Sequence, residues 1–190
     1  MIKPPKVSPS SVIKERKRPP TDKITKTLVE RLNGKITFSW YHFDRKHIAF
    51  NLGGTRLEWY VDLIDALKEV SQRTRYQLQT EHHFRAHKHD WIKLKYKYDL
   101  PEDVWAQLDE DACWQFHLSK STGVVHGFFI DSLLCIVWLD PHHNLYPDQK
   151  YGGAKFFDKP LNMYERILVE KEALEQRIIE LEKDIKELIG

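Results

Sequence analysis

A nearly unbroken heptad repeat of apolar residues occupies the C-terminal end of this chain of 190 residues. Its seam alternates steps of three and four residues and has one charged position, Lys171; the apolar members are Ile167, Leu174, Ile178, Leu181, Ile185 and Leu188. An apolar repeat of 3.5 residues makes helices wrap around one another. We therefore expect residues 161–190 to form a coiled-coil helix, an element that buries its seam against a partner.

The residue types of the seam favour one kind of assembly. Leucine occupies the d positions 174, 181 and 188, and isoleucine the a positions 178 and 185, a combination typical of parallel dimers, in which a charged a residue such as Lys171 limits oligomer size. Arg177 would pair with Glu182 of a second copy, whereas Glu170 and Glu175 would repel. The pattern thus predicts a homodimer or a complex with a partner chain. The alternative is a terminal helix packed on its own domain.

The first part of the chain differs sharply in composition from the rest. Residues 1–26 contain eight Lys or Arg against two acidic residues, together with five prolines. Such a segment cannot bury enough apolar surface to offset the entropy of ordering, so we expect residues 1–22 to be a disordered basic arm. Its predicted nucleic-acid contacts are Lys14, Arg16, Lys17 and Arg18, because a basic arm can bind phosphates. A solubilising tail is the equally supported alternative.

The remaining composition points to one globular domain of ordinary size. The apolar fraction is 41%, and six Trp, eight Tyr and nine Phe suit both a small sheet core and base stacking. Cys113 and Cys135 fall in predicted strands of a chain without a secretory signature, so we expect reduced thiols and a cytoplasmic location. No window approaches 18 apolar residues, which predicts no membrane association.

Residues 23–158 are expected to form an α+β domain, a small curled antiparallel sheet of about four to five strands with one long helix packed on it. The predicted strands are 35–43, 113–118, 124–130 and 133–139, with a strand or loop at 47–52; the predicted helices are 22–32, 56–72 and 102–111. Thr55 and Glu58 form a T-x-x-E capping pattern at the start of the long helix. The last strand is apolar on both faces, which places it inside the sheet.

Histidine is the residue type that most suggests chemistry, since the chain has ten and four of them lie within residues 82–89. The motifs that mark nucleotide-binding loops, dinucleotide folds and nucleophile elbows are not found in the sequence. If residues 82–89 were helical, His83 and His87 would share a face, as zinc ligands often do. Otherwise these histidines and Arg85 are suited to acid–base work on a phosphate, or they belong to a polar loop anchored by Trp91.

A second histidine cluster follows the last predicted strand. His142 lies at the start of a loop that also contains Tyr146, and His126 lies in the neighbouring strand beside Gly127, where it is a site candidate or a core histidine. The predicted catalytic set is Arg85, His87, His89, His126, His142 and Tyr146. These residue types suit metal-independent RNA cleavage without any cofactor, in which the 2′-hydroxyl is activated, the phosphorane is stabilised and the leaving 5′-oxygen is protonated.

The layout of residues 113–146, a strand followed by Gly123-Val-Val-His126-Gly-Phe-Phe-Ile-Asp131 and by a second hairpin strand, resembles the closing strands of small bacterial toxin ribonucleases of the RelE and MazF kinds. This resemblance implies RNA as substrate and a role in bacterial or phage conflict, including antiviral defence. Because it concerns a layout rather than a motif, it assigns no catalytic residue.

Three functions therefore compete. The preferred one is an RNA-binding endoribonuclease of toxin or defence type, which predicts that the histidine clusters converge on one face. The second is a non-catalytic adaptor that dimerises or docks a larger effector through the coiled coil and contacts nucleic acid through the basic arm. The third is a zinc-dependent hydrolase that uses His83 and His87.

Overall fold

The computed structural model describes residues 33–109, 111–119 and 122–190. The predicted basic arm with Lys14, Arg16, Lys17 and Arg18, and the predicted helix 22–32, lie outside these ranges. The described strands are β1 (Thr37–Ser39), β2 (His87–Lys88), β3 (Cys113–His117), β4 (Val124–Ile130) and β5 (Leu133–Asp140); the helices are α2 (Leu57–Val70), α3 (Arg75–Thr80), α4 (Glu102–Trp105) and α5 (Met163–Ile189), with a 3₁₀ turn at Gln149–Tyr151. The predicted α+β class is confirmed.

One open sheet has the strand order β1-β5-β4-β3-β2. Strands β2 to β5 pair antiparallel, as expected, but β1 pairs parallel to β5 through Thr37–Ser39. The sheet is therefore mixed rather than wholly antiparallel. Hydrophobic alternation assigns the two faces of a strand but not the direction of its neighbour, so the sequence pattern could not reveal the parallel pair. The predicted interior position of β5 is confirmed, because β1 and β4 flank it.

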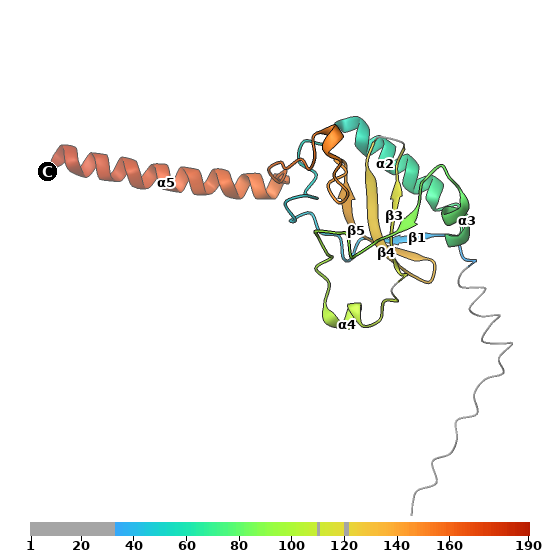
Figure 1. Cartoon of the computed structure of the whole chain (residues 1–190). Helices are drawn as coiled ribbons and strands as arrows, with labels where there is room; N and C mark the ends of the chain where they lie inside the picture. Colours follow the sequence, from blue (N-terminus) through green and yellow to red (C-terminus); the bar gives the residue numbers. More distant parts are fainter. Residues whose placement is uncertain (1–32, 110, 120–121) are drawn as a thin grey trace, which may run out of the picture.

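The two faces of the sheet are covered differently. Helix α2 lies across one face (Figure 1), where its Trp59, Leu63 and Val70 belong to the same buried core as Trp114 and Phe129 of the sheet. The opposite face carries a second core that includes the buried side chains of Phe50, Tyr98, Phe128, Trp138 and Leu145. Much of this second cover comes from loops, and histidine side chains lie among them.

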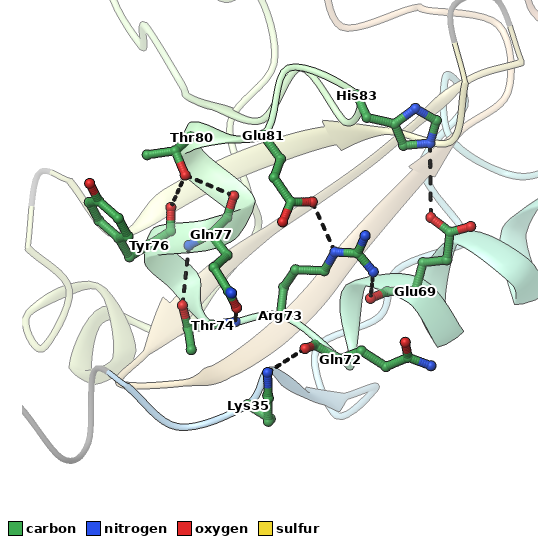
Figure 2. A network of polar contacts seen from close by, with 10 residues as sticks. All are labelled: Lys35, Glu69, Gln72, Arg73, Thr74, Tyr76, Gln77, Thr80, Glu81 and His83. Atoms are coloured by element: carbon green, nitrogen blue, oxygen red, sulfur yellow. Dashed lines mark hydrogen bonds and ion pairs between the residues drawn. The ribbon is translucent and has the colours of Figure 1, made fainter.

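Helix α2 confirms the predicted helix 56–72, but it begins in another way than expected. Arg56 is its N-cap residue, without a side-chain hydrogen bond, and Oγ1 of Thr55 is buried without a partner among the described residues. The capping box forms instead at α3, where Thr74 Oγ1 accepts from the Gln77 amide at 3.2 Å and Gln77 Oε1 accepts from the Thr74 amide at 2.9 Å (Figure 2).

Polar contacts around Arg73 hold α2, α3 and the following loop together (Figure 2). Arg73 donates to the Glu81 carboxylate at 2.9 Å and to the Glu69 carbonyl oxygen at 2.8 Å. His83 Nε2 lies 3.9 Å from a Glu69 carboxylate oxygen. Residues 82–86 form a turn between α3 and β2, so His83 and His87 do not share the face of a helix.

Other predicted elements are shorter than expected. Residues 47–52 form turns rather than a strand. Helix α4 covers four residues of the predicted helix 102–111, and its Val104 and Trp105 pack half-buried against the second core. The core beside these segments determines their backbone, and each contains too few apolar residues to show the period of a helix or a strand.

Helix α5 confirms the predicted C-terminal helix and projects away from the sheet (Figure 1). Asn162 and Glu165 form a capping box at its start, and Arg45 and Lys159 bind the Glu165 carboxylate at 2.9 and 2.7 Å. Every residue of this helix is described, and none is buried. The helix itself is confirmed, whereas its pairing with a second helix stays a prediction.

Candidate functional site

A cavity of about 250 Å³ opens on the loop-covered face of the sheet. Strand pairing places its lining in two rows across the strands, one with His87, Gln115 and His126 and the other with His117, Val124 and Asp140. His143 and Tyr146, from the loop after β5, complete the lining. We call this space the inner cavity. Its walls come from segments that are far apart in the sequence.

A wider cavity of about 560 Å³, the outer cavity, adjoins the inner one and shares His117, His143 and Tyr146 with it. Arg85 and Lys155 bring positive charge to its lining, while Asp148 supplies one carboxylate. The two cavities together form a cleft whose outer end is cationic, whereas its inner end holds neutral polar groups and one buried carboxylate, that of Asp140. Such a gradient suits a ligand that carries an anionic group beside a neutral polar one.

His117 lies at the junction of the two cavities. The centroid of its ring is 5.6 Å from that of His143 and 6.5 Å from that of His87. Burial first, and then the neighbouring His143, His87 and Arg85, lower the pKa of His117 to about 4. His117 is therefore neutral at pH 7 and can accept a proton. A bound anion would raise its pKa towards neutrality.

His87 is held in one tautomer by the backbone. Its Nδ1 lies 2.8 Å from the carbonyl oxygen of Arg85, an atom that can only accept a hydrogen bond. When the ring is neutral, its proton therefore sits on Nδ1, and Nε2 carries a free lone pair. Arg85 itself has a left-handed backbone with a φ of 46°, which forms the turn that presents both side chains to the cleft.

Asp140 organises the loop that follows β5. Its buried carboxylate accepts hydrogen bonds from the amides of Asn144 and Leu145 at 2.8 and 2.9 Å, and from that of His142 at 3.3 Å. Burial alone would raise the pKa of Asp140, but nearby His126 and these amides lower it below its ordinary value. The carboxylate thus stays ionised and fixes the turn that carries His143, whose φ is 60°.

Asn144 fastens the same loop to its surroundings. Its amide nitrogen donates to the carbonyl oxygens of Ala49 and Lys155 at 2.8 and 2.7 Å, and its oxygen accepts from the Lys155 amide at 2.8 Å. Asn144 therefore ties three stretches of chain together. This anchoring positions Lys155 at the outer cavity.

His126 lies at the back of the inner cavity, fully buried. Its Nε2 is 3.5 Å from an Asp140 carboxylate oxygen, close enough for attraction but not aligned for a hydrogen bond. Burial lowers the pKa of His126, although Asp140 acts in the opposite direction. Next to it, Gly127 leaves no room for a side chain, because the carbonyl oxygen of Cys135 lies where a Cβ would stand. The register between β4 and β5 shifts at this point, between His126 and Gly127, and the extra residue, Val137, lies in β5.

His89 stands behind His126 and lines neither cavity. The two rings are 5.3 Å apart, and His89 Nε2 donates to the hydroxyl oxygen of Tyr98 at 2.8 Å, while that hydroxyl donates to the Gly127 carbonyl oxygen. Burial, followed by the neighbouring His126 and His87, lowers the pKa of His89 to about 2. His89 is thus a neutral support for His126 rather than a group that can touch a ligand in the cleft.

His142 lines the outer cavity but is already engaged. Its Nε2 donates to the Gly53 carbonyl oxygen at 2.7 Å, and its ring lies 4.6 Å from that of Phe157. Of the predicted set, His87, His126 and Tyr146 therefore line the inner cavity, and Arg85, His142 and Tyr146 the outer one.

Five residues to which the cleft gives a part were not in the predicted set: Gln115, His117, Asp140, His143 and Lys155. A signal for His117 and Gln115 existed, since pairing the predicted strands 113–118 and 124–130 across their turn brings Gln115 opposite His126. No comparable signal distinguished His143 from His142, because the choice depends on the bond of His142 to Gly53.

Within the described residues, no group of three or more His, Cys, Asp or Glu side chains is arranged to hold a metal ion. In the same part of the chain, no helix is both long and apolar enough to cross a membrane. Comparisons with protein-family models, with curated proteins and with solved structures gave no match.

Proposed function

We propose that the cleft is the active site of a metal-independent endoribonuclease. The observation that carries the proposal is a group of three neighbouring histidine rings. The ring centroid of His117 lies 6.5 Å from that of His87 and 5.6 Å from that of His143, in a cavity that adjoins the cationic outer cavity. Two imidazoles near one phosphate can move one proton onto and another off the reacting oxygens. The toxin-like layout of residues 113–146 supports RNA as the substrate.

In this proposal the residues act as follows. Neutral His117 accepts the proton of the ribose 2′-hydroxyl while the 2′-oxygen attacks phosphorus, and His143 donates a proton to the 5′-oxygen as the P–O5′ bond breaks. The products are a 2′,3′-cyclic phosphate and a 5′-hydroxyl. In the reaction His117 takes up one proton and His143 releases one. Arg85 and Lys155 neutralise the charge that builds on the phosphorane oxygens, and His87 Nε2 binds the hydroxyl or the phosphate.

The test is incubation of labelled RNA in EDTA with the wild-type protein, with His117→Asn and with His82→Asn. His82 is an exposed histidine that does not line the described cavities, so it serves as the matched control. We expect cleavage by the wild type and the control, and a loss of at least about a hundredfold in His117→Asn, the usual contribution of a general base. Intact RNA with all three proteins would refute the proposal.

We further propose that the chain acts as a homodimer joined through α5, with RNA as its partner and the cytoplasm as its location. Apolar residues of the seam are about half exposed in the single chain, with Leu174 at 60% and Leu181 at 43%, and a second copy would cover them. The basic arm would add phosphate contacts in this arrangement.

The exposed seam also favours a second candidate, a non-catalytic adaptor. In that case α5 docks a larger effector, and the cleft binds nucleic acid without cleaving it. Binding that weakens steeply with salt, together with intact RNA in the test above, is the result that this candidate predicts.

A further inference from the structure

Gln115 is a buried amide at the floor of the inner cavity. It is 4% exposed and lies between His87 and His126 in the row across the strands. Its Oε1 finds no hydrogen-bond partner among the described residues. A buried amide oxygen without a hydrogen-bond partner costs free energy, so a sequence that keeps one in a cavity gains from it elsewhere.

We propose that the inner cavity is a nucleobase subsite in which the Gln115 amide recognises the hydrogen-bonding edge of the base. This inference rests on the proposed function, since it places the base beside the phosphate that His117 and His143 would act on. In this proposal the Gln115 amide is the substrate contact that makes the cleft specific for particular bases.

The lining matches the chemistry of a base. The rings of His87, His143 and Tyr146 supply flat surfaces for stacking, and Val124 adds an apolar contact. Gln115 and His126 are uncharged, because burial keeps His126 neutral, and the one carboxylate of the lining, that of Asp140, is already engaged by the Asn144 and Leu145 amides. A base is flat and uncharged with a polar edge, whereas the charged phosphate fits the adjoining cavity with Arg85 and Lys155.

An amide is suited to this task because it offers a donor and an acceptor side by side. Glutamine pairs with base edges in this way in other nucleic-acid complexes. A carboxylate offers only acceptors and an ammonium group only donors, so neither matches an edge that has both.

The experiment measures binding of 3′-mononucleotides by calorimetry in EDTA, in two pairs: adenosine with inosine, and cytidine with uridine. Within each pair an exocyclic amine donor becomes a carbonyl acceptor, and the adjacent ring nitrogen changes from an acceptor to a donor. We expect the wild type to bind the two members of at least one pair with affinities that differ about tenfold, the effect of one good base contact. In Gln115→Leu the ratio should fall towards one.

Gln72→Leu is the control, since Gln72 is an exposed glutamine that lines neither cavity, and it should keep the wild-type ratio. Equal binding of all four nucleotides by the wild type, or a ratio that survives in Gln115→Leu, would overturn the subsite. These results separate it from the proposed catalysis. If the wild type discriminates within a nucleotide pair but does not cleave RNA, the subsite is supported and the ribonuclease is rejected. If it cleaves RNA but binds all four nucleotides equally, the ribonuclease is supported and the subsite is rejected.

Discussion

His89 and His126 lie face to face in the protein interior, and both are neutral at pH 7. Burial lowers the pKa of His89 to about 2 and that of His117 to about 4, and it lowers the pKa of His126 too. The same residues take up protons near pH 6.5 in the unfolded chain. As the pH falls below 6.5, these histidines therefore bind protons in the unfolded state but not in the folded state, and the free energy of unfolding decreases.

We expect the free energy of unfolding, measured with urea, to be lower at pH 5 than at pH 7.5. His89, 8% exposed, should account for about 2 kcal/mol of this loss, the cost of 1.5 pH units below its unfolded value. His89→Phe removes the titrating ring, so its stability should depend less on pH by that amount, even though its baseline is lower. His82→Asn should keep the wild-type dependence. Equal wild-type stability at both pH values would contradict this account.

The Asp140 carboxylate makes the second prediction at this scale. Asp140→Asn replaces one accepting oxygen by an NH₂ group that faces a backbone N–H, so a buried donor loses its acceptor. We expect a loss of about 2–4 kcal/mol in the free energy of unfolding, because several charge-assisted bonds are affected. Asp148→Asn is the matched control, since exposed Asp148 caps only the Lys150 amide, and it should cost less than about 1 kcal/mol. Equal losses in the two variants would argue against an organising role for Asp140.

Residue types alone could predict that histidine side chains line the candidate site, but not which individual residues do so. The abundance of histidine pointed to the cleft, and His87, His126 and Tyr146 were found by their neighbourhood in the sequence. His89 belonged to the predicted set, but it lies beyond the end of β2 and packs against His126 in the interior, so its burial separates it from the cleft. Strand pairing could place Gln115 opposite His126, but its role as a contact depends on the buried Oε1 without a partner among the described residues, which only the folded structure reveals.

At the scale of elements, two threonines show how a capping pattern is decided. Thr55-x-x-Glu58 and Thr74-x-x-Gln77 fit the same rule, yet the box forms at Thr74. At Thr55 the chain enters α2 through Gly53 and Gly54, which pack closely against Phe157 and Asp158, and the helix begins one residue later than the pattern suggests. Tertiary packing at the helix entrance outweighs a local preference of about 1 kcal/mol.

Substitution of each threonine by valine tests this difference. Thr74→Val should lower the free energy of unfolding by about 1 kcal/mol, the value of a lost N-cap bond. Thr55→Val should be neutral or stabilising, because it replaces a buried hydroxyl without a partner among the described residues by a methyl group of similar size. Urea unfolding of both variants gives the comparison. A cost at Thr55 equal to that at Thr74 would show that the Thr55 hydroxyl is in fact bonded.

The elements that sequence patterns predicted well are those with a strong period. Helix α2 has a long helical period and the strands β3, β4 and β5 are rich in apolar residues, and their positions were found within a few residues. Strand β2 has two residues and α4 has four, too few for any period to show. Such short elements exist because the core beside them fixes their backbone, so only the folded structure reveals them.

At the scale of the whole molecule, α5 stands apart from the domain that carries the cleft. Its 27 residues have no buried side chain, and its beginning is tied to the domain by Arg45 and Lys159. A helix without tertiary packing gains little beyond its own propensity and its i,i+4 ion pairs. Its heptad seam gives a physical reason for the helix to persist, provided that a second helix covers the seam.

Ile178 and Ile179 allow a direct test, because these neighbours are 55% and 57% exposed in the single chain. Ile178 occupies an a position of the seam, whereas Ile179 occupies the next position, outside it. If α5 stayed single, lysine at either site would have the same small effect. In the parallel dimer, Ile178→Lys places two charges in the buried seam and should weaken association at least a hundredfold, whereas Ile179→Lys should leave it nearly unchanged. Sedimentation equilibrium measures both, and a monomeric wild-type chain would leave α5 free for a different partner.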